Sequence, residues 1–386
     1  MRPAAPGYGH AVRKCEMITK RKPLGGNRAR TRPIPGPGYV VAIGSGVGEN
    51  IYEIDDALTP GSKHIALRRK LIGGSGINYT FRLMSMGIPV IPVLTVGRDI
   101  LGAEIQAQLR ELWKGKAPES RVEDYLADDR LFCEEVATPE STIIVNGESR
   151  TIVTEKLSQR SLDALAEHIV KRVDDVLEDG ELRIKAVMIG HIYGEDRREG
   201  RVTRAIIDRV RARGSIKVFA NFGLSQIRLG AQHWSEYLKK IDVFQLSLDE
   251  AREFFRKQKS RSLQSVLQWF KNNGIAAVKG RDAVVLAWPF ELGSRLVDST
   301  GAGDAFGSGL VSAIIEDGYS DDDVYTPIVE ARRWAAHACT TVGGASDCPD
   351  REQLSRFVLG IDEFASVRVS AVDEVQLILR LLDKAC

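Results

Sequence analysis

From residue 160 onward, the sequence alternates between helix-type and strand-type segments, and this alternation restricts the fold more than any other feature. Short apolar runs such as 185–190 (KAVMIG) and 216–220 (IKVFA) are typical of buried strands, whereas segments 160–177 and 197–213 are typical of helices. Strands that alternate with helices predict a parallel or mostly parallel sheet with helices on both faces. Such a sheet binds its ligands at the carboxyl ends of its strands.

The same patterns continue to the end of the chain. We predict further strands and helices from their apolar periodicity: strands at 241–246, 275–279, 283–287 and 294–297, and helices at 231–239, 248–258, 262–273, 303–317, 324–342 and 371–384. The predicted class is therefore α/β, with a central, mainly parallel sheet between two layers of helices.

The first half of the chain contains additional strands. Residues 39–44 (YVVAIG) are a short buried strand, and residues 88–96 (IPVIPVLTV) contain two prolines, which is typical of an edge strand. Segments 49–56, 65–72 and 132–155 also have β patterns, the last as strands at 132–138 and 142–154. These three segments predict a small sheet apart from the main body.

Gly44, Gly46 and Gly48 give a superficial match to a glycine-rich nucleotide fingerprint. That fingerprint requires a helix directly after the loop, because the phosphates bind at the amino end of the helix. Residues 49–54 alternate like another strand instead. We therefore predict no dinucleotide site at this position.

Residues 1–37 differ in composition from everything that follows. They are rich in Lys, Arg, Pro and Gly and contain a single acidic residue, Glu16. Such a segment buries too little apolar surface to offset its loss of conformational entropy on folding. We predict a flexible, basic extension followed by one folded domain over residues 38–386. The alternatives are an organelle transit peptide, whose serine enrichment and amphipathic period are lacking, or a start at Met17.

Composition excludes several classes of function. The net charge is +2, so no global charge favours nucleic acid or an anionic membrane as a partner. No run of about 18 apolar residues is present, which argues against a membrane span. The five cysteines are scattered without metal-ligand spacing, so free thiols in a reducing compartment are expected. We expect a cytoplasmic protein, with organelle import through the basic extension as the alternative.

The glycine-rich stretch Asp298–Gly309 (DSTGAGDAFGSG) indicates phosphate chemistry. The small residues Gly301, Ala302 and Gly303 let the backbone approach a ligand closely, and the free amides at the start of the next helix attract an anion. Asp304 would repel a phosphate there unless it takes up a proton, which suits a general base beside a transferring phosphoryl group. Alternatively, Asp304 only caps the helix.

A second glycine-rich stretch is Gly73–Thr80 (GGSGINYT), which opens a helix that Gly87 ends. Asn78 presents an amide in the first turns of this helix. That amide either binds a polyhydroxyl substrate or bonds to its own backbone.

Together, the two stretches resemble the two signatures of the PfkB (ribokinase-like) carbohydrate kinases. The first signature corresponds to GGSGINYT, continued to Gly87 and Gly97, and the second to DSTGAGDAFGSGLV. The resemblance covers residues 38–365. It implies a ribokinase-like fold with a mainly parallel central sheet, flanked by helices, and a small β-sheet lid. The lid would comprise residues 49–72 and 132–155, in agreement with the strand patterns.

The resemblance implies transfer of the γ-phosphoryl group of ATP to a hydroxyl of a sugar or sugar-like substrate. Asp304 would be the general base, and Gly301, Ala302 and Gly303 would form the anion hole. The residues that would contact the substrate are Glu49, Gly73, Gly74 and Asn78. From its place after the strand at 185–190, we add His191 as a substrate contact, with an ordinary surface histidine as the alternative.

The resemblance also places the nucleotide and the metal ions. Glu250 would organise Mg²⁺ through water, and Asp298 and Thr300 lie where several members bind a monovalent cation such as K⁺. Nucleotide contacts would come from Ser247 and Gly280. From its place on a late amphipathic helix, we add His337 near the purine, with a packed helix residue as the alternative.

Several positions depart from the family pattern. Ser247 stands where the family's Asn-x-x-Glu motif has asparagine, and Glu49 replaces a substrate-contacting aspartate. Of the glycines near the nucleotide, only Gly280 matches. Cys348 occupies the place in the last loop where a serine commonly supplies a cation ligand.

Two other functions compete with a sugar kinase. A nucleoside kinase of the same fold would use aromatic side chains to stack the base, and the candidates are Tyr79, Phe132 and Tyr193. A non-catalytic ligand-binding or scaffold protein is the third possibility, because the nucleotide motif is altered. In each case we expect a homodimer, since pairing of two lids would cover apolar residues such as Ile65, Leu67 and Ile143.

Overall fold

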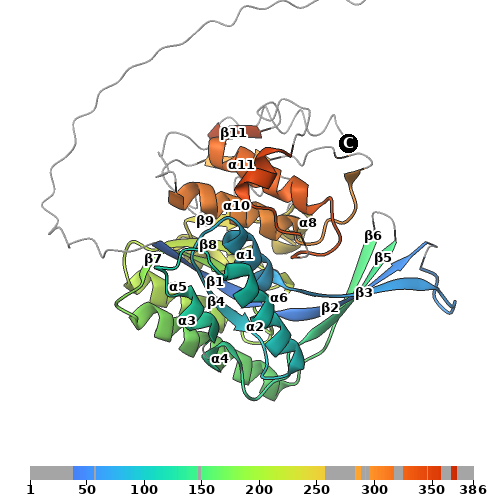
Figure 1. Ribbon diagram of the computed structural model, residues 1–386, viewed down its shortest axis with the longest axis horizontal. Helices are drawn as coiled ribbons and strands as arrows, with labels where there is room; N and C mark the ends of the chain where they lie inside the picture. Colours follow the sequence, from blue (N-terminus) through green and yellow to red (C-terminus); the bar gives the residue numbers. More distant parts are fainter. Residues whose placement is uncertain are drawn as a thin grey trace, which may run out of the picture. The chain divides into compact units, whose positions relative to one another are not determined.

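The computed structural model describes residues 38–55, 58–127, 129–146, 149–256, 283–287, 292, 295–316, 325–345, 347–357 and 367–371 (Figure 1). The predicted extension over residues 1–37 lies outside these ranges, and so do the predicted helix at 262–273 and strand at 275–279. The predicted helix at 371–384 also lies outside them, apart from Ala371, which ends a strand. Within the described ranges, no helix combines the length and apolarity needed to cross a membrane.

Among the described residues, the main sheet has five parallel strands in the order β4-β1-β7-β8-β9. Nearly every residue of β1 is buried, as expected for a strand covered on both faces. The proline-containing strand β4 lies at the edge, where a missing backbone donor is tolerated. The strands are β1 (Gly38–Ser45), β4 (Val90–Thr95), β7 (Arg183–Ile189), β8 (Lys217–Asn221) and β9 (Val243–Gln245).

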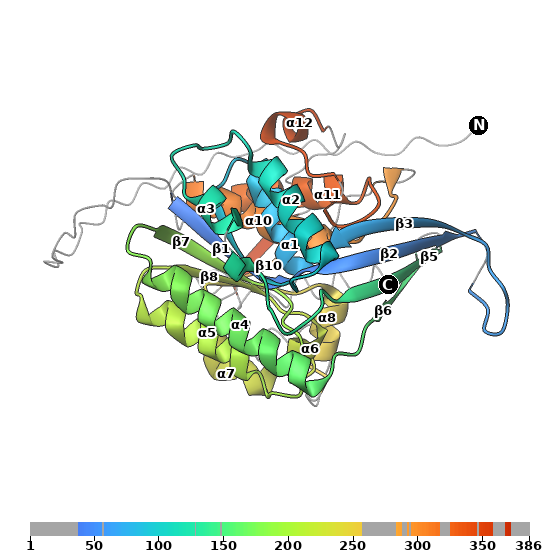
Figure 2. The same cartoon turned by 60° about the horizontal axis from the view of Figure 1, so that its bottom comes forward.

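Helices cover both faces of this sheet (Figure 2). Helices α4, α5 and α7 lie on one face, and α1 and α10 lie on the other. The helices are α1 (Ser75–Ser85), α2 (Ile100–Trp113), α3 (Val122–Ala127), α4 (Gln159–Glu178), α5 (Arg201–Ala212), α6 (Leu224–Ile227), α7 (Ala231–Leu238), α8 (Leu248–Phe254), α10 (Ala302–Glu316), α11 (Tyr325–Ala338) and α12 (Arg351–Ser355), with a 3₁₀ turn at Asp129–Leu131. The predicted three-layer α/β architecture is confirmed.

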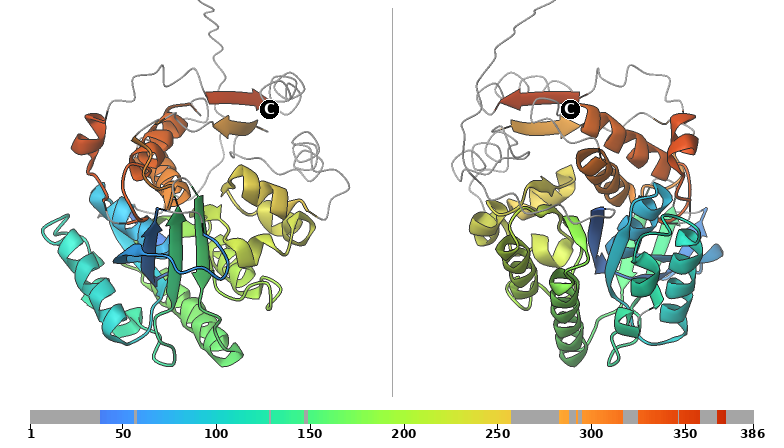
Figure 3. Two further views of the ribbon diagram at one scale, coloured as in Figure 1. Left: turned by 90° about the vertical axis from the view of Figure 1, so that its right-hand side faces the viewer. Right: turned by 60° about the vertical axis from the view of Figure 1, so that its left-hand side comes forward.

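A second, four-stranded sheet forms the predicted lid, in the order β3-β2-β5-β6 (Figure 3, left). Gly46 alone separates β1 from β2, so the chain passes directly from the main sheet into the lid. The lid strands are β2 (Val47–Ile54), β3 (Ala66–Gly73), β5 (Glu140–Asn146) and β6 (Ser149–Thr154). Strands β10 (Ala283–Ala287) and β11 (Val367–Ala371) pair with each other in antiparallel orientation (Figure 3).

Two predicted strands are wrong. Residues 132–138 form a loop, joined to the rest of the β structure by a single bridge at Cys133. Side chains satisfy this loop instead of a strand partner, since the Thr138 amide donates to the Asp99 carboxylate at 2.6 Å. The predicted strand at 294–297 is irregular over its described residues.

The helix predicted at 197–213 begins later, at Arg201. Gly200 has a positive φ of 70°, which breaks the helical path. The buried Glu195 carboxylate then accepts hydrogen bonds from the amides of Val202 and Thr203, at 3.2 and 2.8 Å. These bonds satisfy donors of the first turn and so fix the helix start.

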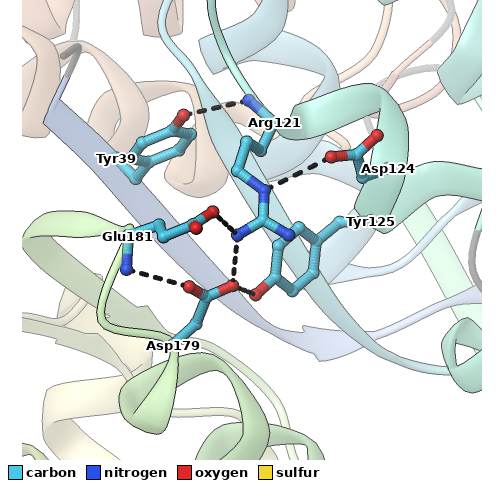
Figure 4. A network of polar contacts seen from close by, with 6 residues as sticks. All are labelled: Tyr39, Arg121, Asp124, Tyr125, Asp179 and Glu181. Atoms are coloured by element: carbon cyan, nitrogen blue, oxygen red, sulfur yellow. Dashed lines mark hydrogen bonds and ion pairs between the residues drawn. The ribbon is translucent and has the colours of Figure 1, made fainter.

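A polar network fastens the amino ends of the main strands (Figure 4). Arg121 donates to Asp179 and to Glu181, both at 2.8 Å, and the Tyr125 hydroxyl donates to Asp179 at 2.7 Å. The hydroxyl of Tyr39, in β1, accepts from the Arg121 amide at 3.0 Å. The network thus ties α3 to the loop before β7, at the strand ends opposite those where ligands bind in this class of sheet.

Candidate functional site

A cleft of about 570 Å³ lies at the carboxyl ends of the parallel strands. Its walls come from β2, β5 and β6 of the lid, from the residues that follow β7, and from the start of α10. The predicted site residues that line it are Glu49, Gly74, Asn78, His191, Thr300, Gly301 and Asp304. Residues far apart in the sequence therefore meet in one cavity large enough for a small molecule.

Asp304, in the first turn of α10, is partly exposed to this cleft. One of its carboxylate oxygens accepts a hydrogen bond from the side-chain amide of Asn78 at 2.7 Å. Burial raises the pKa of Asp304, whereas the Asn78 hydrogen bond and the Arg82 charge act in the opposite direction. Its carboxylate therefore holds a proton more readily than an aspartate in water does, as a general base requires.

The loop before Asp304 has a conformation that only glycine accepts at its turning point. Gly301 has a positive φ of 72°, and a Cβ there would lie 2.5 Å from the Cα of Gly344. The amides of Gly303 and Asp304, early in α10, have no acceptor among the described residues. They are the kind of free donors that bind an anion at a helix start.

Asp298 holds the loop at residues 299–303, the anion loop, in place. Its carboxylate accepts from the amide and the hydroxyl of Thr300, at 2.9 and 2.7 Å, and from the amide of Gly343 at 2.9 Å. Asp298 and Thr300 are both buried, with 7% of their surface exposed. These bonds tie the loop to the turn at 343–344, so Asp298 has a structural task whether or not a cation binds nearby.

The substrate side of the cleft contains Glu49, which projects from β2 and is 6% exposed. Gly73 leaves room for it, because a Cβ at Gly73 would lie 2.3 Å from a Glu49 carboxylate oxygen. Gly74 has a positive φ of 91° and begins α1. The Gly73–Gly74 turn thus positions a buried carboxylate and the helix that bears Asn78.

His191 lies where the sequence predicted it, at the carboxyl end of β7. Its ring packs against Tyr193 with centroids 4.8 Å apart, and both line the cleft. Burial lowers the pKa of His191 to about 4, so the imidazole is neutral near pH 7. A neutral imidazole offers a substrate hydroxyl one donor and one acceptor.

Ser247 and Glu250 form a capping box at the start of α8. A Glu250 carboxylate oxygen accepts from the Ser247 amide at 2.7 Å, and the Ser247 hydroxyl accepts from the Glu250 amide at 3.3 Å. Neither residue lines the cleft. The negative charge of Glu250 nevertheless contributes to the raised pKa of Asp304, so both carboxylates act on the same region.

The remaining predicted nucleotide contacts lie elsewhere. Gly280 is outside the described residues. His337, on α11, packs edge to face against Phe357 with ring centroids 5.1 Å apart and does not line the cleft. Burial lowers the pKa of His337, so its ring is also neutral near pH 7.

The two motifs do not predict some of the contacts that build the site. Gln245, at the end of β9, donates to the carbonyl of Gly303 at 2.8 Å. The Ser75 hydroxyl accepts from the His191 amide at 2.8 Å and so holds the loop that bears this histidine. A usable signal exists for Gln245, because polar residues at the carboxyl ends of parallel strands lie at the ligand-binding edge.

Comparison by sequence finds a partial match. No protein-family model matches the chain. A fructokinase from Escherichia coli is 31% identical to it over 126 residues, which make up 30% of this chain and 41% of the fructokinase. The chain thus spans about two fifths of the length of this curated relative.

Solved structures match most of the chain. Ribokinase from Giardia lamblia aligns with a TM-score of 0.62 at 17% identity, covering 83% of this chain and 100% of the ribokinase. Arabidopsis thaliana ribokinase, solved with ribose and ATP, gives 0.55 at 17% identity, with coverages of 85% and 100%. A Burkholderia thailandensis nucleoside kinase, solved with inosine, gives 0.56 at 14% identity, with coverages of 82% and 96%.

A helix-covered parallel sheet and a lid sheet match the fold of ribokinase. The chain has the ribokinase-like fold, which the sugar and nucleoside kinases named above share. The fold that the two motifs predicted is therefore confirmed.

Proposed function

We propose that the chain is an ATP-dependent kinase that transfers the γ-phosphoryl group to a hydroxyl of a sugar or sugar-like substrate. One observation carries this proposal. The Asp304 carboxylate, held at 2.7 Å by Asn78, reaches a cleft of about 570 Å³ beside the free amides that begin α10. A base and an anion site side by side are what hydroxyl phosphorylation requires.

In this proposal Asp304 accepts the proton of the substrate hydroxyl as its oxygen bonds to phosphorus and the bond from phosphorus to the nucleotide oxygen breaks. The raised pKa of Asp304 favours this proton transfer. Negative charge that develops on the phosphoryl oxygens meets the amides of Gly301, Gly303 and, once its 3.3 Å bond to the Ser299 carbonyl opens, Ala302. A well-placed donor of this kind contributes about 2.7–4 kcal/mol to stabilisation of the transition state.

ATP supplies the phosphoryl group, and its Mg²⁺ neutralises charge on the phosphates. Among the described residues, no group of three or more His, Cys, Asp or Glu is arranged to hold a metal. The chain therefore fits an ion bound chiefly by phosphate, which Glu250 would hold through water while it caps α8. Nucleotide contacts at Ser247, Gly280 and His337 remain part of the proposal.

A monovalent cation at Asp298 and Thr300 fits less well. The Asp298 carboxylate already accepts bonds from Thr300 and Gly343. The next carbonyl of that turn, on Gly344, accepts from the buried Arg82 guanidinium at 2.7 Å, which places a positive charge beside this region. We therefore route no step through K⁺.

The lining favours a polyhydroxyl substrate. The carboxylate of Glu49, the neutral ring of His191 and the amide of Asn78 present acceptors and donors on one side of the cleft. The match to a fructokinase supports a sugar as the substrate class. A nucleoside is the second candidate, because the Tyr193–His191 ring pair offers an aromatic surface. Of the other aromatic candidates, Tyr79 and Phe132 are buried and do not line the cleft.

A substrate panel tests the proposal. Purified protein, ATP and Mg²⁺ are incubated with hexoses, pentoses, sugar acids and nucleosides, and ADP release is measured, with thermal stability recorded in parallel. We expect ADP release that depends on a sugar. Faster release with a nucleoside would select the second candidate. Neither turnover nor a thermal shift with Mg·ATP would favour a non-catalytic relative and contradict the proposal.

A further inference from the structure

Arg82 is a buried cation directly behind the anion loop. It follows Asn78 by four residues on α1, and therefore lies on the same face of the helix. Its side chain is 0% exposed, and its Nη2 donates to the carbonyl of Gly344 at 2.7 Å. Its Nε and Nη1 are buried without an acceptor in the described part of the chain. Such burial is costly, so an interaction elsewhere must offset it.

Gly344 connects Arg82 to the groups that would carry the chemistry. A Cβ on Gly344 would lie 2.5 Å from the Asn78 side-chain nitrogen, and a Cβ on Gly301 would lie 2.5 Å from the Gly344 Cα. The preceding residue, Gly343, donates its amide to Asp298. The turn at 343–344 therefore packs against the anion loop and the amide that orients Asp304, and a shift of the turn would displace both.

The charge of Arg82 also acts on Asp304. It opposes burial, which raises the pKa of Asp304. The other groups that act on this carboxylate are Tyr79 from α1 and Glu250 from α8. Burial lowers the pKa of His337, and the Arg82 charge acts in the same direction; burial raises the pKa of Cys348, and the Arg82 charge opposes that rise. An ionised Asp304 and the buried guanidinium thus stabilise each other.

We propose that Arg82 is a positioning residue whose buried guanidinium fixes the turn at 343–344 behind the anion loop and makes a bound monovalent cation there unnecessary. Its effect on turnover rests on the proposed function. Its effect on the charge of Asp304 does not, so the two ideas can fail separately.

The first test compares Arg82→Met with a matched control, Arg172→Met. Methionine keeps the length of the chain but removes the charge and the donors. Arg172 is 2% exposed and stacks on Tyr125 at 5.1 Å, away from the cleft. We expect Arg82→Met to lower kcat about 10–100-fold, by analogy with residues that orient metal-ligating side chains, with little change in KM. In its pH profile of kcat/KM, the acid limb should move to higher pH, because Asp304 loses the Arg82 charge that lowers its pKa. Arg82→Lys should return the acid limb to its wild-type position.

Arg172→Met should lower Tm without moving the pH profile. An unchanged acid limb in Arg82→Met would overturn the proposal. If Arg82→Met does not fold, Arg82→Gln takes its place, because it keeps a donor for Gly344 and removes only the charge.

The second test needs no activity. Thermal unfolding at pH 7.5 is measured for wild type, Arg82→Met, Asp304→Asn and the double variant. We expect Asp304→Asn to raise Tm more in the Arg82→Met background, because the ionised carboxylate there has lost its buried counter-charge. Equal Tm shifts in the two backgrounds would contradict the proposal, even if the wild type phosphorylates no substrate.

The third test replaces K⁺ by choline at constant ionic strength. We expect the Tm of the wild type and its kcat to stay unchanged. A saturable rise in either quantity with K⁺ would show that the guanidinium does not replace a cation.

Discussion

At the residue scale, burial changes two proton affinities in opposite directions. It raises the pKa of Asp304 and lowers the pKa of His191 to about 4. Removal of water disfavours the charged form of each group, which is the carboxylate for Asp304 and the imidazolium for His191. The result is a stronger base beside a neutral hydrogen-bonding ring, and both properties suit a hydroxyl substrate.

We predict that His191 titrates near pH 4, in contrast to an imidazole in water, because the folded protein disfavours the charged ring. The unfolded chain takes up this proton first. The stability that His191 contributes is therefore complete above about pH 6.5 and is lost as the pH falls through about 4. An NMR titration of the imidazole nitrogens checks this, with His191→Gln to assign the signal. A midpoint near 6.5 would contradict it.

Single residues also show what sequence can and cannot predict. Local composition marked the loop of Gly301 but left the role of Asn78 open, and the structure brings both to Asp304. Arg82 and Gln245 were not predicted, because their partners are backbone carbonyls more than fifty residues away. No local pattern identifies the carbonyl partners, since tertiary packing determines them. The place of Gln245 at the carboxyl end of a strand marks only the ligand-binding edge.

At the scale of elements, the strands and helices that alternate were predicted best, because their apolar periodicity reflects burial directly. The strand predicted at 132–138 was wrong for a different reason. Its residues have β-type composition, but Asp99 and Thr138 satisfy each other through two bonds, of 2.6 and 2.8 Å. Side chains that bond the backbone compete with a strand partner, and composition does not reveal which of them prevails.

The network around Asp179 is a structural element remote from the cleft. Although burial acts to raise it, hydrogen bonds from Tyr125 and the Glu181 amide, together with the charge of Arg121, lower the pKa of Asp179. The stability that Asp179 contributes is therefore present above the ordinary pKa of aspartate. It is lost as the pH falls through the lower pKa that Asp179 has in the folded protein.

We predict that Tyr125→Phe lowers the free energy of unfolding by about 1.5–3 kcal/mol, the usual effect of one hydrogen bond to a charged group. The bond lost is 2.7 Å long, and it lies away from the lining of the cleft, so kcat should not change. Urea denaturation with parallel kinetics checks this. Tyr52→Phe is the matched control, because its hydroxyl bonds to no described residue. Equal losses in both variants would contradict the network's role.

At the scale of the whole molecule, the lid exposes apolar surface. Ile65, Leu67, Ile152 and Val153 are 89, 58, 49 and 58% exposed. Ile143, expected to be bare, is instead 1% exposed and lines the cleft. We propose that two lids pair in a homodimer, since exposed apolar strands of this kind are normally covered.

We predict that Ile65→Glu combined with Leu67→Glu dissociates this dimer, because two charges would be buried between the lids. Light scattering after size-exclusion chromatography measures the mass. Ile100→Glu is the control, since Ile100 is 90% exposed on α2, outside the lid. A monomeric wild type would refute lid pairing.

The central claim is that Asp304 removes the proton from the substrate hydroxyl. Asp304→Asn keeps the size of the side chain and an acceptor for Asn78 but cannot take up the proton. In single-turnover kinetics with saturating Mg·ATP and sugar, we expect phosphoryl transfer to slow by roughly 10²–10⁴-fold, with nucleotide affinity retained. Asp208→Asn, which loses a surface contact to Lys240, serves as the control and should transfer at the wild-type rate. Wild-type transfer by Asp304→Asn would contradict the claim.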